Sequence, residues 1–214
     1  MLAIAHRAGN DLETLREAVR LGADAVEADV HLHDARLEVR HQKTLGPLPW
    51  LWDKWELFPA ALPRPLLGDI LDALPPGATV MLDLKGVGRV GAVAARVLHA
   101  RSPEHPLMVC ARWWPSVLPF QDAPWATVLL SARGHVELLR LRRRLRTGTP
   151  PDGVSVHLSM LTPAVVAEIK ERAPLVLTWP VDDEESLQRA HEVGVSGVIT
   201  KDLEIVRQVA AARR

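Results

Sequence analysis

The fold is decided by two stretches, Leu2-Ala3-Ile4-Ala5-His6-Arg7 and Leu21-Gly22-Ala23-Asp24-Ala25-Val26-Glu27-Ala28-Asp29-Val30. Each contains a short apolar run typical of a buried strand, and each carries charged residues where that strand should end. The segment between them, 11–21, has the pattern of a helix with Asp11 as its N-cap. Charged groups at the ends of buried strands are costly unless they bind a metal, a phosphate or one another. The two stretches therefore indicate a βαβ unit with a polar site at its edge.

The same alternation of short apolar segments and helical patterns continues along nearly the whole chain. Nearly continuous apolar strands joined by helices are typical of a parallel sheet covered on both faces. Segments 25–30 and 37–41 are too close together for a helix and should pair directly. In 214 residues, this pattern predicts an α/β fold, a (β/α)8 TIM barrel in a single domain, 1–214. The predicted strands are 3–6, 25–30, 37–41, 79–85, 107–111, 127–131, 154–157, 175–179 and 195–200. The predicted helices are 11–21, 67–74, 90–100, 136–145, 163–172 and 184–193.

Composition excludes several classes of protein. Lys and Arg together number 26, as do Asp and Glu, so the chain lacks the excess of positive charge that is typical of nucleic-acid-binding proteins. The one cysteine, Cys110, cannot form a disulfide scaffold, suits a reducing compartment and is expected to be a buried apolar residue. The N-terminal segment becomes polar too soon for a signal peptide, and no apolar run is long enough to span a bilayer. We expect a cytoplasmic protein without stable membrane insertion.

The polar residues at the predicted strand ends should converge, because all strands of a closed barrel point their carboxyl ends at one mouth. Glu27 and Asp29 should share one face of their strand, as should Asp83 and Lys85, because side chains alternate along a strand. The residues expected at the mouth are His6, Arg7, Glu27, Asp29, His41, Asp83 and Lys85.

These residue types indicate phosphate chemistry. The carboxylates of Glu27, Asp29 and Asp83 suit Mg²⁺ or Ca²⁺ better than zinc. Arg7 and Lys85 are expected to bind a phosphate that the metal also contacts.

Histidines complete the predicted site. His6 and His41 could supply a general acid and a general base near neutral pH. His31 and His33 continue the alternation from Asp29, but they precede a predicted turn, and we expect them to face solvent rather than bind a metal.

Six segments, in order, resemble the glycerophosphodiester phosphodiesterase family. They are His6-Arg7, Leu21 to Val30, Val39-Arg40-His41, Leu82-Asp83-Leu84-Lys85, Leu177-Thr178-Trp179-Pro180-Val181 and Gly194 to Thr200. The resemblance implies a TIM barrel that uses a divalent metal to hydrolyse a glycerophosphodiester, a small-molecule substrate, to glycerol 3-phosphate and an alcohol. It implies catalytic roles for His6 and His41, metal ligation by Glu27, Asp29 and Asp83, and substrate binding by Arg7, Lys85 and Trp179.

The sequence departs from the family pattern at three places. The loop after Arg7 is short and keeps only Asn10 of the family's Pro-Glu-Asn-Thr, with Asp11 in place of the capping threonine. Gln42 stands where the family has an aspartate, and a neutral amide could orient His41 but not tune its pKa. Asp83 is one methylene shorter than the family's glutamate.

These departures motivate an alternative, a catalytically impaired barrel that binds a phosphorylated ligand without hydrolysing it. A third reading is a sugar-phosphate isomerase, which would need a phosphate site at the last two strands.

Two other segments are distinctive. Segment 46–60 carries Trp50, Trp52 and Trp55 and could be an apolar lid over the mouth, an interfacial contact, or an element that packs the loop onto the barrel. The arginine-rich stretch 140–146 is interpreted as the solvated face of a helix, because leucines at 138, 141 and 145 form an apolar stripe.

Overall fold

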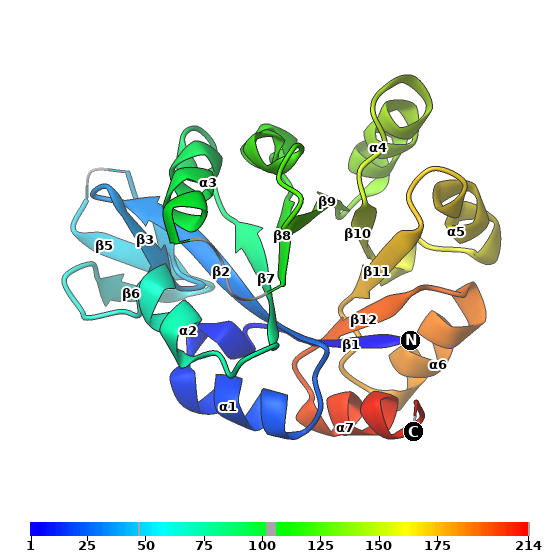
Figure 1. Ribbon diagram of the computed structural model, residues 1–214, viewed down its shortest axis with the longest axis horizontal. Coiled ribbons are helices and arrows are strands. Elements are labelled where there is room, and N and C mark those ends of the chain that lie inside the picture. The colour runs from blue at the N-terminus through cyan, green and yellow to red at the C-terminus, as the bar shows by residue number, and fades with distance from the viewer. Residues whose placement is uncertain (47, 102–105, 214) are drawn as a thin grey trace.

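In the computed structural model, which describes residues 1–46, 48–101 and 106–213, the centre is a closed barrel of parallel strands (Figure 1). The main sheet has nine strands in the order β1-β12-β11-β10-β9-β8-β7-β2-β3, and β1 also pairs with β2. Since β3 pairs antiparallel to β2, the other eight strands close the ring. The (β/α)8 prediction is confirmed. The strands are β1 (Leu2–Ala5), β2 (Ala25–His33), β3 (Arg36–Val39), β7 (Thr79–Leu84), β8 (Leu107–Ala111), β9 (Ala126–Ala132), β10 (Gly153–His157), β11 (Leu175–Trp179) and β12 (Gly197–Thr200).

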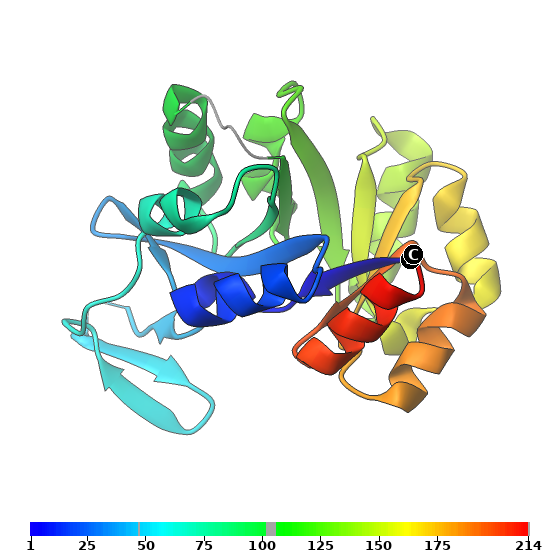
Figure 2. The ribbon, with the colours of Figure 1, turned by 60° about the horizontal axis from the view of Figure 1, so that its bottom comes forward.

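Helices surround the barrel, and Figure 2 shows α1 and α7 side by side on its outer surface. Asp11 caps α1 as predicted, accepting hydrogen bonds from the backbone N–H groups of Glu13 and Thr14. The leucine stripe of α4 is buried at Leu138, Leu141 and Leu145. No helix in the described ranges is both long and apolar enough to cross a bilayer. The helices are α1 (Leu12–Arg20), α2 (Leu67–Ala73), α3 (Val90–Arg101), α4 (His135–Thr147), α5 (Pro163–Lys170), α6 (Glu184–Val193) and α7 (Leu203–Ala211).

The core has two layers, as a filled barrel requires. The larger one lies between the strands and the helices. The smaller one fills the inside of the barrel, and Cys110 belongs to it as a buried apolar residue. Its other buried members are Ile4, Ala25, Met81, Leu129, Leu177 and Ile199. This inner layer is the floor on which the polar mouth is built.

One helix, α7, was not predicted, and two expectations need correction. Segment 43–59 forms a small antiparallel sheet of β4 (Lys43–Thr44), β5 (Trp50–Asp53) and β6 (Glu56–Pro59) where a loop was expected. Strand β2 continues through His31 to His33 because β3 pairs with it there, so the prediction that these histidines leave the strand was wrong.

The small sheet leaves its tryptophans largely outside the barrel. Leu51 is buried, whereas the side chains of Trp50, Trp52 and Trp55 are exposed. The Nζ of Lys43 lies 5.1 Å from the centroid of the Trp52 ring, a cation–π distance. Residue 47 of the predicted 46–60 segment lies outside the described residues.

Candidate active site

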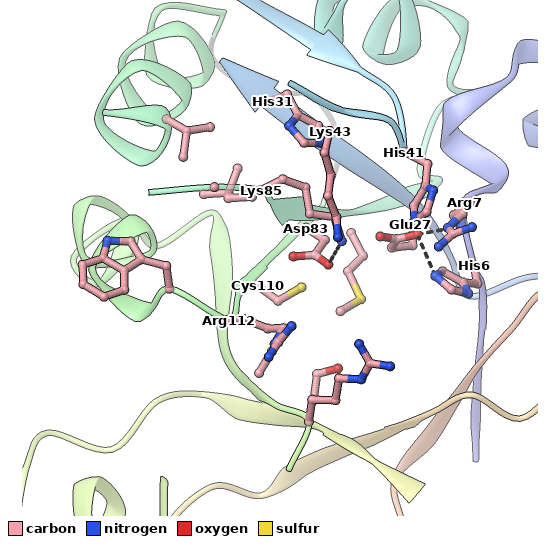
Figure 3. A pocket seen from close by; sticks show the side chains of 18 of the residues that line it. His6, Arg7, Glu27, His31, His41, Lys43, Asp83, Lys85, Cys110 and Arg112 are labelled. Carbon is pink, nitrogen blue, oxygen red and sulfur yellow. Dashed lines mark hydrogen bonds and ion pairs between the residues drawn. The ribbon is translucent and has the colours of Figure 1, made fainter. Parts of the chain in front are cut away.

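A cavity of about 680 Å³ opens at the carboxyl ends of the barrel strands (Figure 3). Seven predicted site residues line it: His6, Arg7, Glu27, His41, Asp83, Lys85 and Trp179. The eighth, Asp29, is fully buried beneath this surface. Trp50, Trp52 and Trp55 are not among the lining residues, whereas Trp113 and Trp179 are. The structure therefore brings the predicted residues together but does not place the tryptophans of the small sheet over the mouth.

A hydrogen bond to Glu27 of β2 holds the residues that follow β1 in place. Arg7 adopts a left-handed backbone conformation with φ of 59°, which is uncommon for a residue with a side chain. In this conformation the Arg7 backbone N–H donates a 2.6 Å hydrogen bond to Oε2 of Glu27. The same oxygen lies 3.9 Å from Nε2 of His6. A strained turn held by a buried carboxylate thus positions His6 and Arg7.

The short loop after Arg7 keeps one residue that supports the site. Asn10 donates a 2.8 Å hydrogen bond through its side-chain nitrogen to Oδ2 of Asp29. Its side-chain oxygen accepts a 2.8 Å hydrogen bond from the Asp29 backbone N–H. The loop packs tightly on β2, since a Cβ added at Gly9 would lie 2.8 Å from that of Ala28. Asn10 therefore fixes both the side chain and the backbone of Asp29, although the loop is short.

Three carboxylates form an acidic cluster. Oxygens of Glu27, Asp29 and Asp83 lie within 4.8 Å of one another, and Asp29 and Asp83 are paired in register across β2 and β7. The Lys85 ammonium lies 2.6 Å from Oδ1 of Asp29 and also forms an ion pair with Asp83. Lys85 thus neutralises part of the charge that converges here.

The ionisation of this cluster reflects its burial. Burial raises the pKa of Glu27 well above its usual range, and the neighbouring Asp29 raises it further. Burial also raises the pKa of Asp29, but the Lys85 ammonium and the Asn10 hydrogen bond outweigh it, so the net shift is downward. The pKa of Lys85 is raised, because Asp83, Asp29 and Glu27 outweigh its burial.

The donor set fits a hard divalent cation. Three carboxylates, with no thiolate or imidazole in the cluster, match the oxygen ligands of Mg²⁺ or Ca²⁺. A cation there would also stabilise the charged form of Glu27, which burial disfavours. The acidic cluster is therefore a possible divalent-metal site.

An aspartate that sequence reasoning missed supports His41. Oδ2 of Asp53, at the end of β5, lies 2.8 Å from Nδ1 of His41. In the described ranges no hydrogen bond joins the Gln42 side chain to His41; the Gln42 backbone oxygen instead accepts one from Arg40. A carboxylate partner for His41 is thus supplied by Asp53 of the small sheet and not by position 42.

The other histidines behave differently from one another. Burial, followed by the charge of Arg7, lowers the pKa of His6 to about 4. His31 lines the cavity rather than facing solvent, and burial followed by Arg40 lowers its pKa to about 3. His33 instead lies 3.3 Å from Glu38 of β3.

A second group of polar residues lies on the opposite wall. Arg112 and Arg133 follow β8 and β9, and both line the cavity together with Trp113. Ser131 and Ser155, both buried, line the same cavity. Arg112 directly follows the predicted strand 107–111, whereas Arg133 lies two residues beyond the predicted strand 127–131, so the sequence alone did not pair them.

Comparison with solved structures shows which known barrels this fold resembles. A phosphodiesterase from Oleispira antarctica in complex with the product sn-glycerol-3-phosphate superimposes with a TM-score of 0.75, at 17% identity over 99% of this chain and 97% of that one. A glycerophosphodiester phosphodiesterase from Thermotoga maritima gives a TM-score of 0.72, at 16% identity over 98% of each chain. The chain has the fold of the glycerophosphodiester phosphodiesterases. The resemblance seen in the sequence is thus confirmed at the level of the fold.

The glycerophosphodiester phosphodiesterase fold is one form of a widespread barrel. The N-(5'-phosphoribosyl)anthranilate isomerase of Pyrococcus furiosus, another barrel, gives a TM-score of 0.58 at 14% identity over 99% of this chain and 97% of that one. No family model matches the sequence, and no curated protein matches it. The similarity therefore lies in the fold, and function has to be inferred from the residues at the mouth.

Proposed function

We propose that the chain is a metal-dependent phosphodiesterase that hydrolyses glycerophosphodiesters to glycerol 3-phosphate and an alcohol. The observation that carries the proposal is the convergence of His6, Arg7 and His41 on the acidic cluster at one barrel mouth. Support comes from the Oleispira antarctica phosphodiesterase of the same fold, which was solved with sn-glycerol-3-phosphate.

Glu27, Asp29 and Asp83 would hold the metal. When bound, a divalent ion would lower the pKa of the attacking water and stabilise charge on the phosphoryl oxygens. Arg7 and Lys85 contribute positive charge beside the three carboxylates, so an anionic diester can approach without strong repulsion. Asn10 holds Asp29 in place through two hydrogen bonds.

The two histidines supply the proton transfers. One imidazole takes a proton from the attacking water, and the other gives a proton to the oxygen of the leaving alcohol. Asp53 accepts a hydrogen bond at Nδ1 of His41, which leaves Nε2 as the atom for proton transfer and stabilises the ring when it is positively charged. Water is consumed, one P–O bond breaks and one forms, so the reaction is a balanced hydrolysis.

The test is hydrolysis of sn-glycero-3-phosphocholine in the presence of Mg²⁺ or Ca²⁺. We expect His6→Ala and His41→Ala each to remove most of kcat while the circular dichroism spectrum is kept. His99→Ala is the matched control, because His99 is exposed on α3, away from the cavity. Full activity in either active-site variant would refute the assigned roles.

One observation favours a second candidate, a barrel that binds a phosphorylated ligand without hydrolysing it. Lys85 already forms ion pairs with two of the three carboxylates, Asp29 and Asp83, and so competes with a metal for them. Saturable binding of glycerol 3-phosphate without metal-dependent turnover would support this candidate. The isomerase reading is weaker, since the described residues of the last two strands that line the cavity, Trp179 and Ile199, carry no charge that could bind a phosphate.

A further inference from the structure

We propose that the wall formed by Arg112 and Arg133 is a subsite for a second negatively charged group on the substrate. This inference rests on the proposed function and names its substrate class. The preferred substrate would be a phosphodiester that carries a further phosphate or carboxylate, away from the phosphorus that is attacked.

Glu137 contacts both Arg112 and Arg133. Arg112 forms an ion pair with Glu137 Oε1, and the Arg133 backbone N–H donates a hydrogen bond to Oε2 of the same carboxylate. The two residues follow neighbouring strands, since β8 and β9 pair up to Ala111 and Leu130. Figure 3 shows Arg112 on the wall opposite His41 and Arg7. Glu137 therefore links the Arg112 side chain to the backbone of Arg133 on the same wall.

The charge of this wall is not balanced within the cavity. In the described ranges the lining carboxylates are Glu27 and Asp83, which belong to β2 and β7. Glu137 engages the Arg112 side chain, whereas no ion pair involves the Arg133 guanidinium in the part of the chain that the structure describes. Arginine presents several donors to phosphate or carboxylate oxygens, and it remains charged at any physiological pH.

The position of the wall suits a second anion rather than the attacked phosphate. The attacked phosphate belongs beside Arg7, Lys85 and the acidic cluster, at the ends of β1, β2 and β7. Arg112 and Arg133 line the same cavity as Arg7 and Lys85, so a diester bound at the acidic cluster can extend toward the ends of β8 and β9.

A quaternary ammonium group is the competing occupant, because Trp113 lies on the same wall and could bind it by a cation–π contact. Arg112, adjacent in sequence, and Arg133 would repel such a group. Glu137 offsets the charge of Arg112, but the Arg133 guanidinium has no ion pair in the described residues, so we expect an anionic group to be preferred over a cation on the exposed ring.

The test compares the binding of two diesters, sn-glycero-3-phosphocholine and sn-glycero-3-phosphoinositol 4-phosphate, by titration calorimetry with Mg²⁺. The His41→Ala background prevents turnover. We expect the phosphorylated diester to bind at least about tenfold more tightly, as one or two charge-assisted hydrogen bonds would give. Adding Arg112→Gln and Arg133→Gln should reduce this preference about tenfold. Adding Arg140→Gln and Arg143→Gln, which together remove the same two charges from the exposed face of α4, should preserve it.

Equal or tighter binding of glycerophosphocholine would overturn the inference, as would a preference that survives the Arg112→Gln, Arg133→Gln double variant. Turnover by the wild-type protein is scored separately. Metal-dependent turnover without a preference supports the proposed function and refutes the subsite. A preference that depends on the arginines, without turnover, supports the subsite and refutes the proposed function.

Discussion

The Asp53–His41 pair yields the sharpest prediction. Asp53→Asn keeps the size of the side chain but removes the charge that faces Nδ1 of His41 at 2.8 Å. A hydrogen bond to a charged group contributes about 2 kcal/mol, which corresponds to roughly a 30-fold loss of kcat if it acts in the transition state. Both side chains are about three-quarters buried, at 26% and 24% exposure, so solvent screens the pair only partly.

The assay is steady-state hydrolysis of a glycerophosphodiester with saturating metal. We expect kcat to fall and KM to stay within about threefold, because Asp53 acts through His41 and does not contact the substrate. Glu56→Gln is the matched control, since Glu56 is the exposed cross-strand partner of Asp53 on the same small sheet. A kcat for Asp53→Asn within twofold of the Glu56→Gln value would refute the role assigned to Asp53.

Three further predictions concern stability and support of the site. Gly91→Ala should lower the free energy of unfolding by at least about 2 kcal/mol in urea titrations, because the new Cβ would lie 1.8 Å from the Ser116 backbone oxygen. This loss is expected even though alanine favours a helix more than glycine does, and a stabilised variant would contradict this packing. Phe120→Ala should cost about 3–5 kcal/mol by the same measurement, since Phe120 is fully buried, and a loss below 1 kcal/mol would be inconsistent with its burial. Asn10→Ala should weaken metal binding about 10- to 100-fold in calorimetry, because Asp29 loses both of its hydrogen bonds to Asn10. An unchanged metal affinity would show that Asn10 does not position Asp29 for metal binding.

The predictable part of the site depended on order along the chain. Strand ends converge in any closed parallel barrel, so His6, Glu27 and Asp83 could be assigned to one mouth before their distances were known. The alternation of side chains along β2 also placed Glu27 and Asp29 together. Local patterns thus sufficed wherever the barrel geometry itself fixed the position.

The missed residues depend on tertiary pairing. Asp53 reaches His41 only because segment 43–59 folds into three short antiparallel strands, and its tryptophans and prolines obscured that pattern. His31 faces the cavity because β3 extends β2 beyond the barrel. Arg112 and Arg133 are single charged residues after strands, and their proximity becomes evident only through their shared contact with Glu137.

The most direct test of the central claim is phosphorus NMR of sn-glycero-3-phosphocholine incubated with the purified protein. We predict that the diester signal is converted to that of glycerol 3-phosphate when Mg²⁺ or Ca²⁺ is present, and that EDTA stops the conversion. Glu27→Gln should abolish it while the protein remains folded, because the variant loses one of three carboxylates in the acidic cluster. Conversion at the same rate in EDTA, or in the Glu27→Gln variant, would contradict a metal-dependent phosphodiesterase built on this cluster.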